Sequence, residues 1–278
     1  MAATVRTLTN DDLMAVVGLL HRRPFENVFV ASRIRTGGLE SFTLGCEVWG
    51  YEEDGELRSI LHHGANLVPV SASPEALDAY CAALGPTRTC ASIVGVAEEA
   101  MGLWERLCAR WGGSWANPRE IRSRQPLMVI SDPPSVAPDP RVLRVGMEDV
   151  DSYFDAAVAM YTEEVGVSPL DGSNGYRWYV ERLIGQGRAM GIVDRDHVVF
   201  KSDVGSATTN VCQVAGVWLR PDLRGRGLSA PAMATVVELC REEWEHVSLY
   251  VNDYNTRARG LYRKVGFEEI GDLATVLY

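Results

Sequence analysis

The stretch of the sequence with the most evident chemistry is a loop that alternates glycine with arginine. It reads Arg224-Gly225-Arg226-Gly227-Leu228-Ser229 and follows the apolar run 214–219. Glycine lets a backbone approach a ligand closely and adopt positive φ. Unpaired N–H groups at a helix N-terminus form an anion site, and an arginine fork binds two phosphate oxygens. The loop therefore predicts pyrophosphate binding at the start of a helix that begins near Leu228.

Two other phosphate motifs fit less well. The pattern GxxxxGK[ST] of a P-loop is absent from the sequence. Residues 225–230, GRGLSA, match the short dinucleotide pattern GxGxxG/A, but no ribose-binding acid lies on a second strand near 245–250. A nicotinamide-dependent enzyme is thus the weaker alternative, and a solvent-exposed turn without a ligand is the simplest one.

Composition limits the classes of partner and location. The 278 residues carry a net charge of −10, which disfavours nucleic acid and favours a cationic acceptor. No apolar run reaches the roughly 20 residues that span a bilayer, and the N-terminus lacks a secretory pattern. The six cysteines form no CxxC pair. The adjacent His62 and His63 would point to opposite faces of a strand. We expect a cytoplasmic protein without metal and without membrane contact.

The elements that would position the loop are readable in the second half of the chain. Residues 131–140 contain four prolines, which predicts an extended linker and a domain boundary. The expected domains are 1–131 and 141–278, joined by the linker 132–140. Apolar periodicity in the second half predicts strands and helices in the following ranges: strand 141–145, helical region 146–164, two strands within 189–204, strand 211–219, helix 229–244, strand 246–251, helix 256–265 and strand 267–278.

The first half has a similar order of elements but lacks the special loop. Its strand 65–70 is followed by SASPEAL, which contains neither glycine nor arginine. We therefore expect two copies of one α/β unit, of which the first has lost the anion site. An unrelated N-terminal domain is the alternative.

Two separated motifs in the second half resemble the GNAT superfamily of acyl-CoA-dependent N-acetyltransferases. The family's pyrophosphate loop is R/Q-x-x-G-x-G/A, which residues 224–229 match except that Ser229 replaces glycine or alanine. The second motif lies about 30 residues further on and matches at six positions: Asn255, Ala258, Leu261, Tyr262, Gly266 and Phe267. The resemblance implies a mixed α/β fold, here a tandem GNAT fold with a degenerate N-terminal lobe, similar to two-lobed actinobacterial members.

The resemblance also implies a role for individual residues. The backbone of Val217, Trp218 and Leu219 would contact the pantetheine arm of acetyl-CoA, and the N–H groups of residues 225–229 would hold its pyrophosphate. Asn255 would contact the cofactor near its pantetheine, although a helix cap is the alternative. Tyr262 would protonate the departing CoA thiolate, with a core aromatic as the alternative.

The implied reaction is direct attack of a primary amine, on a small molecule or a protein, on the thioester of acetyl-CoA. An alkyl amine is mostly protonated at pH 7, so a base or a water chain must accept its proton. Gln213 stands where several relatives carry a glutamate, and it cannot act as a base. The candidate carboxylates are Glu163, Glu164 and Asp203, among which the sequence does not decide.

A different class of function stays open beside the enzyme. A protein that senses acyl-CoA would keep the phosphate loop and lose catalysis, and Gln213 is compatible with that reading. Tyr262 argues for the enzyme, because a sensor has no use for a proton donor to the thiolate. The N-terminal half would complete the acceptor cleft, stabilise the C-terminal lobe or mediate a homodimer.

Overall fold

The computed structural model describes residues 3–278, and the contacts among them define two compact units. The first unit runs to Leu127 and also includes Tyr250–Asn255 and Glu269–Tyr278, whereas the second contains Met128–Leu249 and Thr256–Glu268. Two segments near the C-terminus thus return to the first unit. The division into domains 1–131 and 141–278 remains a prediction about the organisation of the sequence.

The first unit holds an antiparallel meander followed by a parallel pair. Its strand order is β1-β2-β3-β4-β5-β12, with β4 and β5 parallel and the other neighbours antiparallel. The elements of this unit are the following: β1 (Ala3–Thr7), α1 (Leu13–His21), α2 (Val28–Gly37), α3 (Ser41–Leu44), β2 (Glu47–Glu53), β3 (Glu56–His63), β4 (Asn66–Val70), α4 (Pro74–Leu84), β5 (Ser92–Val96), α5 (Ala97–Trp111) and β12 (Glu268–Leu277). The boundary between the units falls within β6 (Glu120–Ile130).

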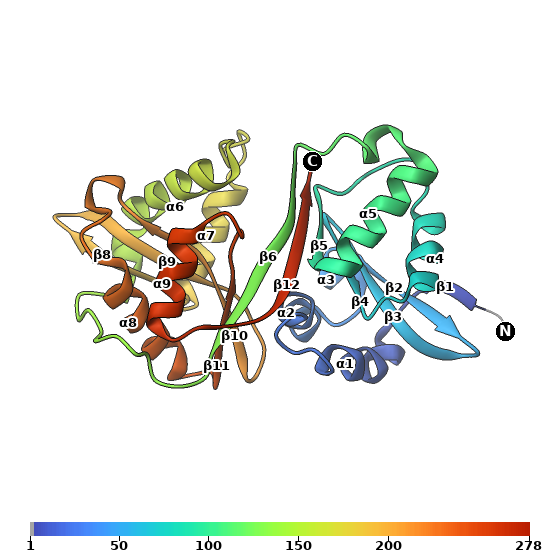
Figure 1. Cartoon of the computed structure of the whole chain (residues 1–278), viewed down its shortest axis with the longest axis horizontal. Helices are drawn as coiled ribbons and strands as arrows, with labels where there is room; N and C mark the ends of the chain where they lie inside the picture. The colour runs from blue at the N-terminus through green and yellow to red at the C-terminus, as the bar shows by residue number, and fades with distance from the viewer. Residues whose placement is uncertain (1–2) are drawn as a thin grey trace. The chain divides into compact units, whose positions relative to one another are not determined.

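The second unit repeats this arrangement. Its strand order is β7-β8-β9-β10-β11, with β10 and β11 parallel and the other neighbours antiparallel. Its elements are the following: β7 (Leu143–Arg144), α6 (Val150–Val165), α7 (Gly175–Gly185), β8 (Ala189–Asp194), β9 (His197–Ala207), β10 (Val211–Leu219), α8 (Ser229–Arg241), β11 (His246–Tyr250) and α9 (Thr256–Val265). Helices α6 and α7 pack together, as do α8 and α9 (Figure 1).

The order of elements and the sense of the strands are therefore the same in the two units. In each, helices separate the first strand from the second, one helix joins the fourth strand to the fifth, and another follows the fifth. The predicted repeat of one α/β unit is confirmed. Strand β12 lies in the first unit and pairs with β5 from Leu273 to Leu277.

Helix α8 buries the face that the apolar spacing predicts. Met233, Val236, Val237 and Cys240 are buried along it, and Pro231 occupies its first turn, where a missing N–H costs no hydrogen bond. Helix α7 begins at Gly175, inside a stretch whose Gly, Ser, Asn and Asp content indicates a loop. Its buried face of Val180, Leu183 and Ile184 packs against the core of the second unit.

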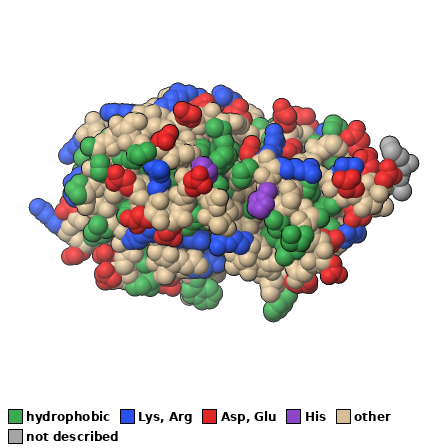
Figure 2. Space-filling view, turned by 90° about the horizontal axis from the view of Figure 1, so that it is seen from below, with side chains coloured by type: hydrophobic (Ala, Val, Ile, Leu, Met, Phe, Trp, Pro, Cys, Tyr) green, Lys and Arg blue, Asp and Glu red, His purple; other side chains and the backbone are tan. Residues whose placement is uncertain are grey.

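The surface carries charges of both signs. On the face drawn in Figure 2, acidic and basic side chains are interspersed, and hydrophobic side chains lie in separate groups between them. Within residues 3–278, no helix combines the length and the hydrophobicity needed to cross a bilayer.

A buried carboxylate makes the stability of the first unit depend on pH. Glu99 on α5 is buried, accepts the N–H of Ala72 at 3.0 Å and lies 3.6 Å from Arg23. Burial raises its pKa to about 7. Between the ordinary pKa of glutamate and this value, the folded chain binds a proton that the unfolded chain has released. The contribution of Glu99 is therefore most favourable below the unfolded pKa and is lost as the pH rises towards 7.

Replacing Glu99 with glutamine is accordingly expected to stabilise the protein at pH 8. The amide still accepts the N–H of Ala72 but removes the buried charge, with a gain of about 2–3 kcal/mol. At pH 4.5 the gain should be nearly absent. Thermal unfolding at both pH values measures the effect, and Glu98→Gln, at an exposed neighbouring position, is the control. Equal melting temperatures for the wild type and Glu99→Gln at pH 8 would contradict the prediction.

Candidate active site

Strand β10 is irregular where it approaches the glycine-rich loop. Its parallel pairing with β11 covers Val211–Gln213, whereas its antiparallel pairing with β9 continues to Leu219. The register against β9 shifts between Ala215 and Trp218, so that the two residues between them have no partner in the described register. Gly216, one of these two, has φ +59°. This is a β-bulge, a feature that redirects backbone groups next to many active sites.

The loop that follows β10 has the backbone that its glycines predict. Gly225 and Gly227 both have φ +77°, which favours glycine, and a Cβ on either would meet no atom within 4 Å. The loop leads into α8, whose N-terminus has no side-chain cap and no acidic residue in its first turn. The N–H groups at the start of α8 are thus not satisfied by a capping side chain, which is the requirement for binding an anion there.

The corresponding helix of the first unit, α4, is closed to an anion. The hydroxyl of Ser73 accepts the N–H of Ala76 at 3.3 Å, and Glu75 adds a negative charge to the first turn. The carboxylate of Glu99 already binds the N–H of Ala72 just before the helix. The protein's own acidic and hydroxyl groups therefore occupy this helix start, which gives the degeneracy of the first unit a physical basis.

The two arginines of the loop differ in their surroundings. Arg224 is part-buried, and its guanidinium donates to both carboxylate oxygens of Glu163 at 2.5 and 2.8 Å and to the Leu219 carbonyl at 2.9 Å. Arg226 is exposed. Arg224 thus holds the loop to α6 and β10, whereas the side chain of Arg226 lies exposed to solvent.

Both carboxylate oxygens of Glu163 are therefore hydrogen-bonded. Besides Arg224 it accepts the indole N–H of Trp218 at 3.2 Å. The hydrogen bonds from Arg224 lower the pKa of Glu163. A carboxylate that is paired on both oxygens and whose pKa is lowered accepts a proton poorly at neutral pH.

Tyr262 on α9 is buried and packs edge-on against Phe267, with the ring centroids 5.8 Å apart. Burial, with a smaller effect from the charge of Glu164, raises the pKa of this phenol. The phenol therefore keeps its proton at neutral pH.

Asn255 immediately precedes α9 and belongs to the first compact unit. Its backbone N–H donates to the carbonyl of Asn252 at 2.9 Å. This bond closes a turn just before the helix, and the two roles considered for the Asn255 side chain, cofactor contact and helix cap, both stay predictions.

A buried charge cluster beneath the bulge was only partly foreseen. Lys201 is fully buried and donates to Asp203 Oδ2 at 2.6 Å and to the carbonyl of Gly216 at 3.0 Å. The hydroxyl of Tyr153 on α6 donates to the other Asp203 oxygen and also lies 3.0 Å from the carbonyl of Ser202. Asp203 was a candidate base, but both its oxygens are held in this cluster. Lys201 and Tyr153 carried no sequence motif that pointed to them.

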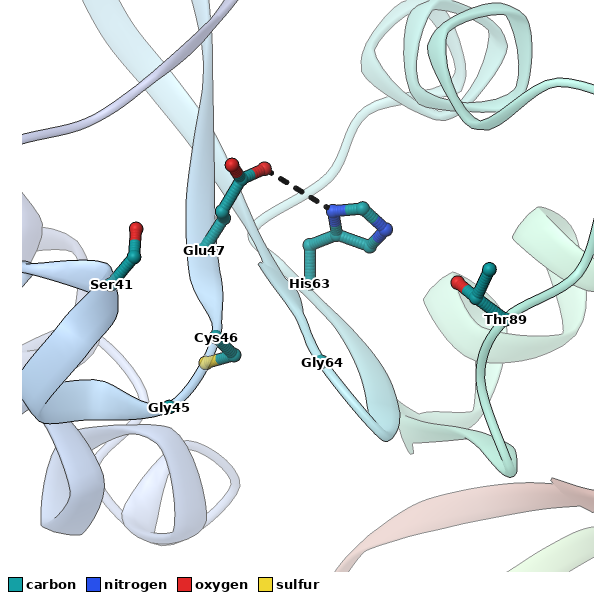
Figure 3. Close-up of a pocket in the computed structure, with 7 residues that line it drawn as sticks. All are labelled: Ser41, Gly45, Cys46, Glu47, His63, Gly64 and Thr89. Atoms are coloured by element: carbon teal, nitrogen blue, oxygen red, sulfur yellow. Dashed lines mark ion pairs between the residues drawn. The ribbon is translucent and has the colours of Figure 1, made fainter.

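A cavity lies elsewhere, in the first unit. It has a volume of about 350 Å³ and is lined by the residues drawn in Figure 3, among which Glu47 and His63 form an ion pair. The thiol of Cys46 lies 3.2 Å from His62, and burial raises the pKa of that thiol. A thiol of raised pKa is a weak nucleophile. None of the predicted site residues lines this cavity.

No group of three or more His, Cys, Asp or Glu side chains in the described part of the chain is arranged to hold a metal ion.

Comparison with known proteins assigns the second unit to a family. Residues 149–267 match the model of the acetyltransferase (GNAT) family, and residues 46–153 match a domain of unknown function, DUF4081. Three solved structures share the fold over 99% of this chain. They are a GNAT-family acetyltransferase from Colwellia psychrerythraea (11% identity, 99% of that chain, TM-score 0.60), a GCN5-related N-acetyltransferase from Sphaerobacter thermophilus (17%, 95%, 0.61) and a tandem GNAT protein from the clavulanic acid biosynthesis pathway (12%, 98%, 0.55).

Residues 149–267 thus belong to the GNAT family, and the resemblance drawn from the two motifs is confirmed. At these identities the solved structures establish the fold, which is a tandem GNAT fold as expected. Membership in this family implies acyl transfer from an acyl-CoA.

Proposed function

We propose that the protein transfers an acetyl group from acetyl-CoA to a primary amine at the C-terminal ends of β10 and β11. The observation that carries this proposal is the N-terminus of α8, which has no side-chain cap. A loop with two left-handed glycines connects it to the bulged strand β10. In this site the N–H groups of residues 225–229 hold the pyrophosphate. Arg226 supplies an exposed positive charge, and Arg224 keeps the loop in place through Glu163.

The pantetheine arm is proposed to run beside Val217, Trp218 and Leu219. Strand β10 pairs in parallel with β11 over Val211–Gln213, and its later residues extend past this pairing. An extended ligand can bind the backbone groups of such a strand as an added strand does. Contact between Asn255 and the cofactor stays a prediction.

In the proposed reaction the amine nitrogen forms a bond to the thioester carbon and the carbon–sulfur bond breaks. The sulfur leaves with the electron pair and takes a proton from Tyr262. The amine proton is proposed to pass to one of the three candidate carboxylates, Glu163, Glu164 or Asp203, or to a water chain. Glu163 is paired with Arg224 and Asp203 with Lys201. Gln213 is buried on β10 and cannot take this role.

A panel of amines tests the activity directly. Release of free CoA thiol is measured with acetyl-CoA and polyamines, amino sugars, amino-acid amines and N-terminal peptides, the cationic acceptors that the net charge of −10 favours. Turnover with one class of amine supports the proposal. Binding of acetyl-CoA without CoA release from any amine would instead indicate an acyl-CoA-sensing protein.

Replacing Tyr262 with phenylalanine is expected to lower kcat about 100-fold with the best acceptor in the panel, since it removes the proposed proton donor. The dissociation constant for acetyl-CoA should stay within about threefold, because the ring and its packing on Phe267 remain. Steady-state kinetics and calorimetry measure the two effects. Tyr254→Phe, at an exposed position in the first unit, is the control. Unchanged kcat in Tyr262→Phe would assign Tyr262 to the core alone.

A further inference from the structure

The β10 bulge lies against a buried ion pair between Lys201 and Asp203, and burying these charges costs free energy. Lys201 has no exposed surface, Asp203 is 6% exposed, and their charged groups lie 2.6 Å apart. Taking both charges out of water costs free energy that a hydrophobic pair would not. The ion pair therefore adds no stability beyond that of a packed hydrophobic pair, and its role must follow from its location next to the bulge.

The cluster binds one peptide group of the bulge, that between Gly216 and Val217. Lys201 donates to the carbonyl of Gly216 at 3.0 Å. A Cβ on Gly216 would lie 2.7 Å from Asp203 Oδ2 and 2.8 Å from Lys201 Nζ, so the backbone is pressed directly against the ion pair. The left-handed φ of +59° and the absence of a side chain are both needed for this approach.

The orientation of the next N–H group follows from peptide geometry. The Gly216–Val217 peptide is trans, since the described chain has no cis bond, and its C=O and N–H therefore point in opposite directions. Because the carbonyl points at Lys201, the Val217 N–H points away from the buried cluster. Gly216 and Val217 are also the residues that the β9 register leaves out.

The ammonium group also changes the strength of that N–H as a donor. A hydrogen bond from a cation to a peptide carbonyl polarises the peptide, and hydrogen bonds in a chain strengthen one another, more so at low dielectric. Asp203 and Tyr153 fix the ammonium in place, because Asp203 binds Lys201 through one oxygen and Tyr153 through the other.

We propose that Lys201 is a positioning residue which, held by Asp203 and Tyr153, orients and polarises the Gly216–Val217 peptide so that the Val217 N–H stabilises the thioester oxygen as it gains negative charge. The inference rests on the proposed function, because it needs acetyl-CoA in the second unit. Preorganised donors aimed at a developing oxyanion lower the barrier to acyl transfer. No covalent bond is made to Lys201, and no proton leaves it.

The test is infrared spectroscopy of bound acetyl-CoA that carries ¹³C at the acetyl carbonyl. The variant is Lys201→Met/Asp203→Leu, which removes both charges together; Tyr153 can then donate to the Ser202 carbonyl, 3.0 Å away. Replacing both partners of a buried pair by apolar groups is often neutral for stability. The matched control, Arg177→Met/Asp151→Leu, removes an exposed ion pair of the same unit.

In the wild type and the control we expect the labelled carbonyl band at lower wavenumber than in the double variant. The affinity for acetyl-CoA should stay within about threefold, and kcat with the best acceptor should fall about 10- to 100-fold in the double variant. A purely structural role would leave the band unmoved. An unmoved band with acetyl-CoA bound overturns the inference while leaving the proposed function intact, whereas absence of binding to the wild type overturns both.

A second variant keeps the test decisive if the double variant does not fold. Tyr153→Phe removes one hydroxyl and retains the packing of a fully buried ring. It leaves Lys201 less firmly held, so the band is expected to move in the same direction by a smaller amount. A folded Tyr153→Phe protein whose band coincides with that of the wild type counts against the proposal.

Discussion

Gly227→Glu is expected to weaken acetyl-CoA binding by at least about 1,000-fold, which corresponds to about 4 kcal/mol. Two effects combine. Gly227 has φ +77°, a conformation that strains any residue with a side chain, so the loop must change shape. The new carboxylate also places negative charge at the positive end of α8, where the pyrophosphate is proposed to bind. The strain removes N–H donors from the ligand, and the charge repels it.

Calorimetric titration with acetyl-CoA measures this loss. Gly18→Glu makes the same chemical change on α1, at an exposed position with no left-handed φ and no atom within 4 Å of the added Cβ. The control should bind acetyl-CoA as the wild type does. If Gly227→Glu bound it equally well, the pyrophosphate would have to lie away from the start of α8.

Lys201→Met alone is expected to destabilise the protein by about 3–5 kcal/mol, because it leaves the buried carboxylate of Asp203 without its cation. The remaining donor to that carboxylate is Tyr153, which serves the other oxygen. Denaturation in urea, followed by tryptophan fluorescence, gives the change in the free energy of unfolding. The expected fall is large compared with ordinary surface substitutions.

Arg177→Met is the matched control for this variant. It removes a cation from an exposed ion pair with Asp151, for which about 0–1 kcal/mol is expected. The pair Lys201→Met/Asp203→Leu should recover most of the stability lost in the single variant. If Lys201→Met were as stable as the wild type, water or another group would be pairing with the Asp203 carboxylate. The claim that the cluster holds Lys201 in a fixed position would then fail.

The local parts of the fold could be predicted from the sequence because each rests on residues close together in the chain. The predicted ranges 211–219 and 256–265 coincide with β10 and α9. Gly225 and Gly227 have the positive φ that was expected of glycines in this loop. The start of α8 at Ser229 follows from the same loop chemistry together with Pro231 in its first turn.

The parts that escaped prediction depend on contacts between residues far apart in the chain. Tyr153 and Asp203 are 50 residues apart and meet only because α6 packs on β9. The bulge at Gly216 depends on the register with β9, which an apolar run cannot reveal. Glu163 was a candidate base, and its pairing with Arg224 spans 61 residues. The return of β12 to the first unit depends on strand pairing that the linker prolines do not encode.

The measurement that tests the central claim most directly is calorimetric titration of the wild-type protein with acetyl-CoA, with NADH as the comparison ligand. The account predicts saturable binding of acetyl-CoA at one site per chain, competed by CoA, and no binding of NADH under the same conditions. Absence of binding by acetyl-CoA and CoA, or preferential binding of NADH, would contradict it. The uncapped start of α8 would then serve another anion or none.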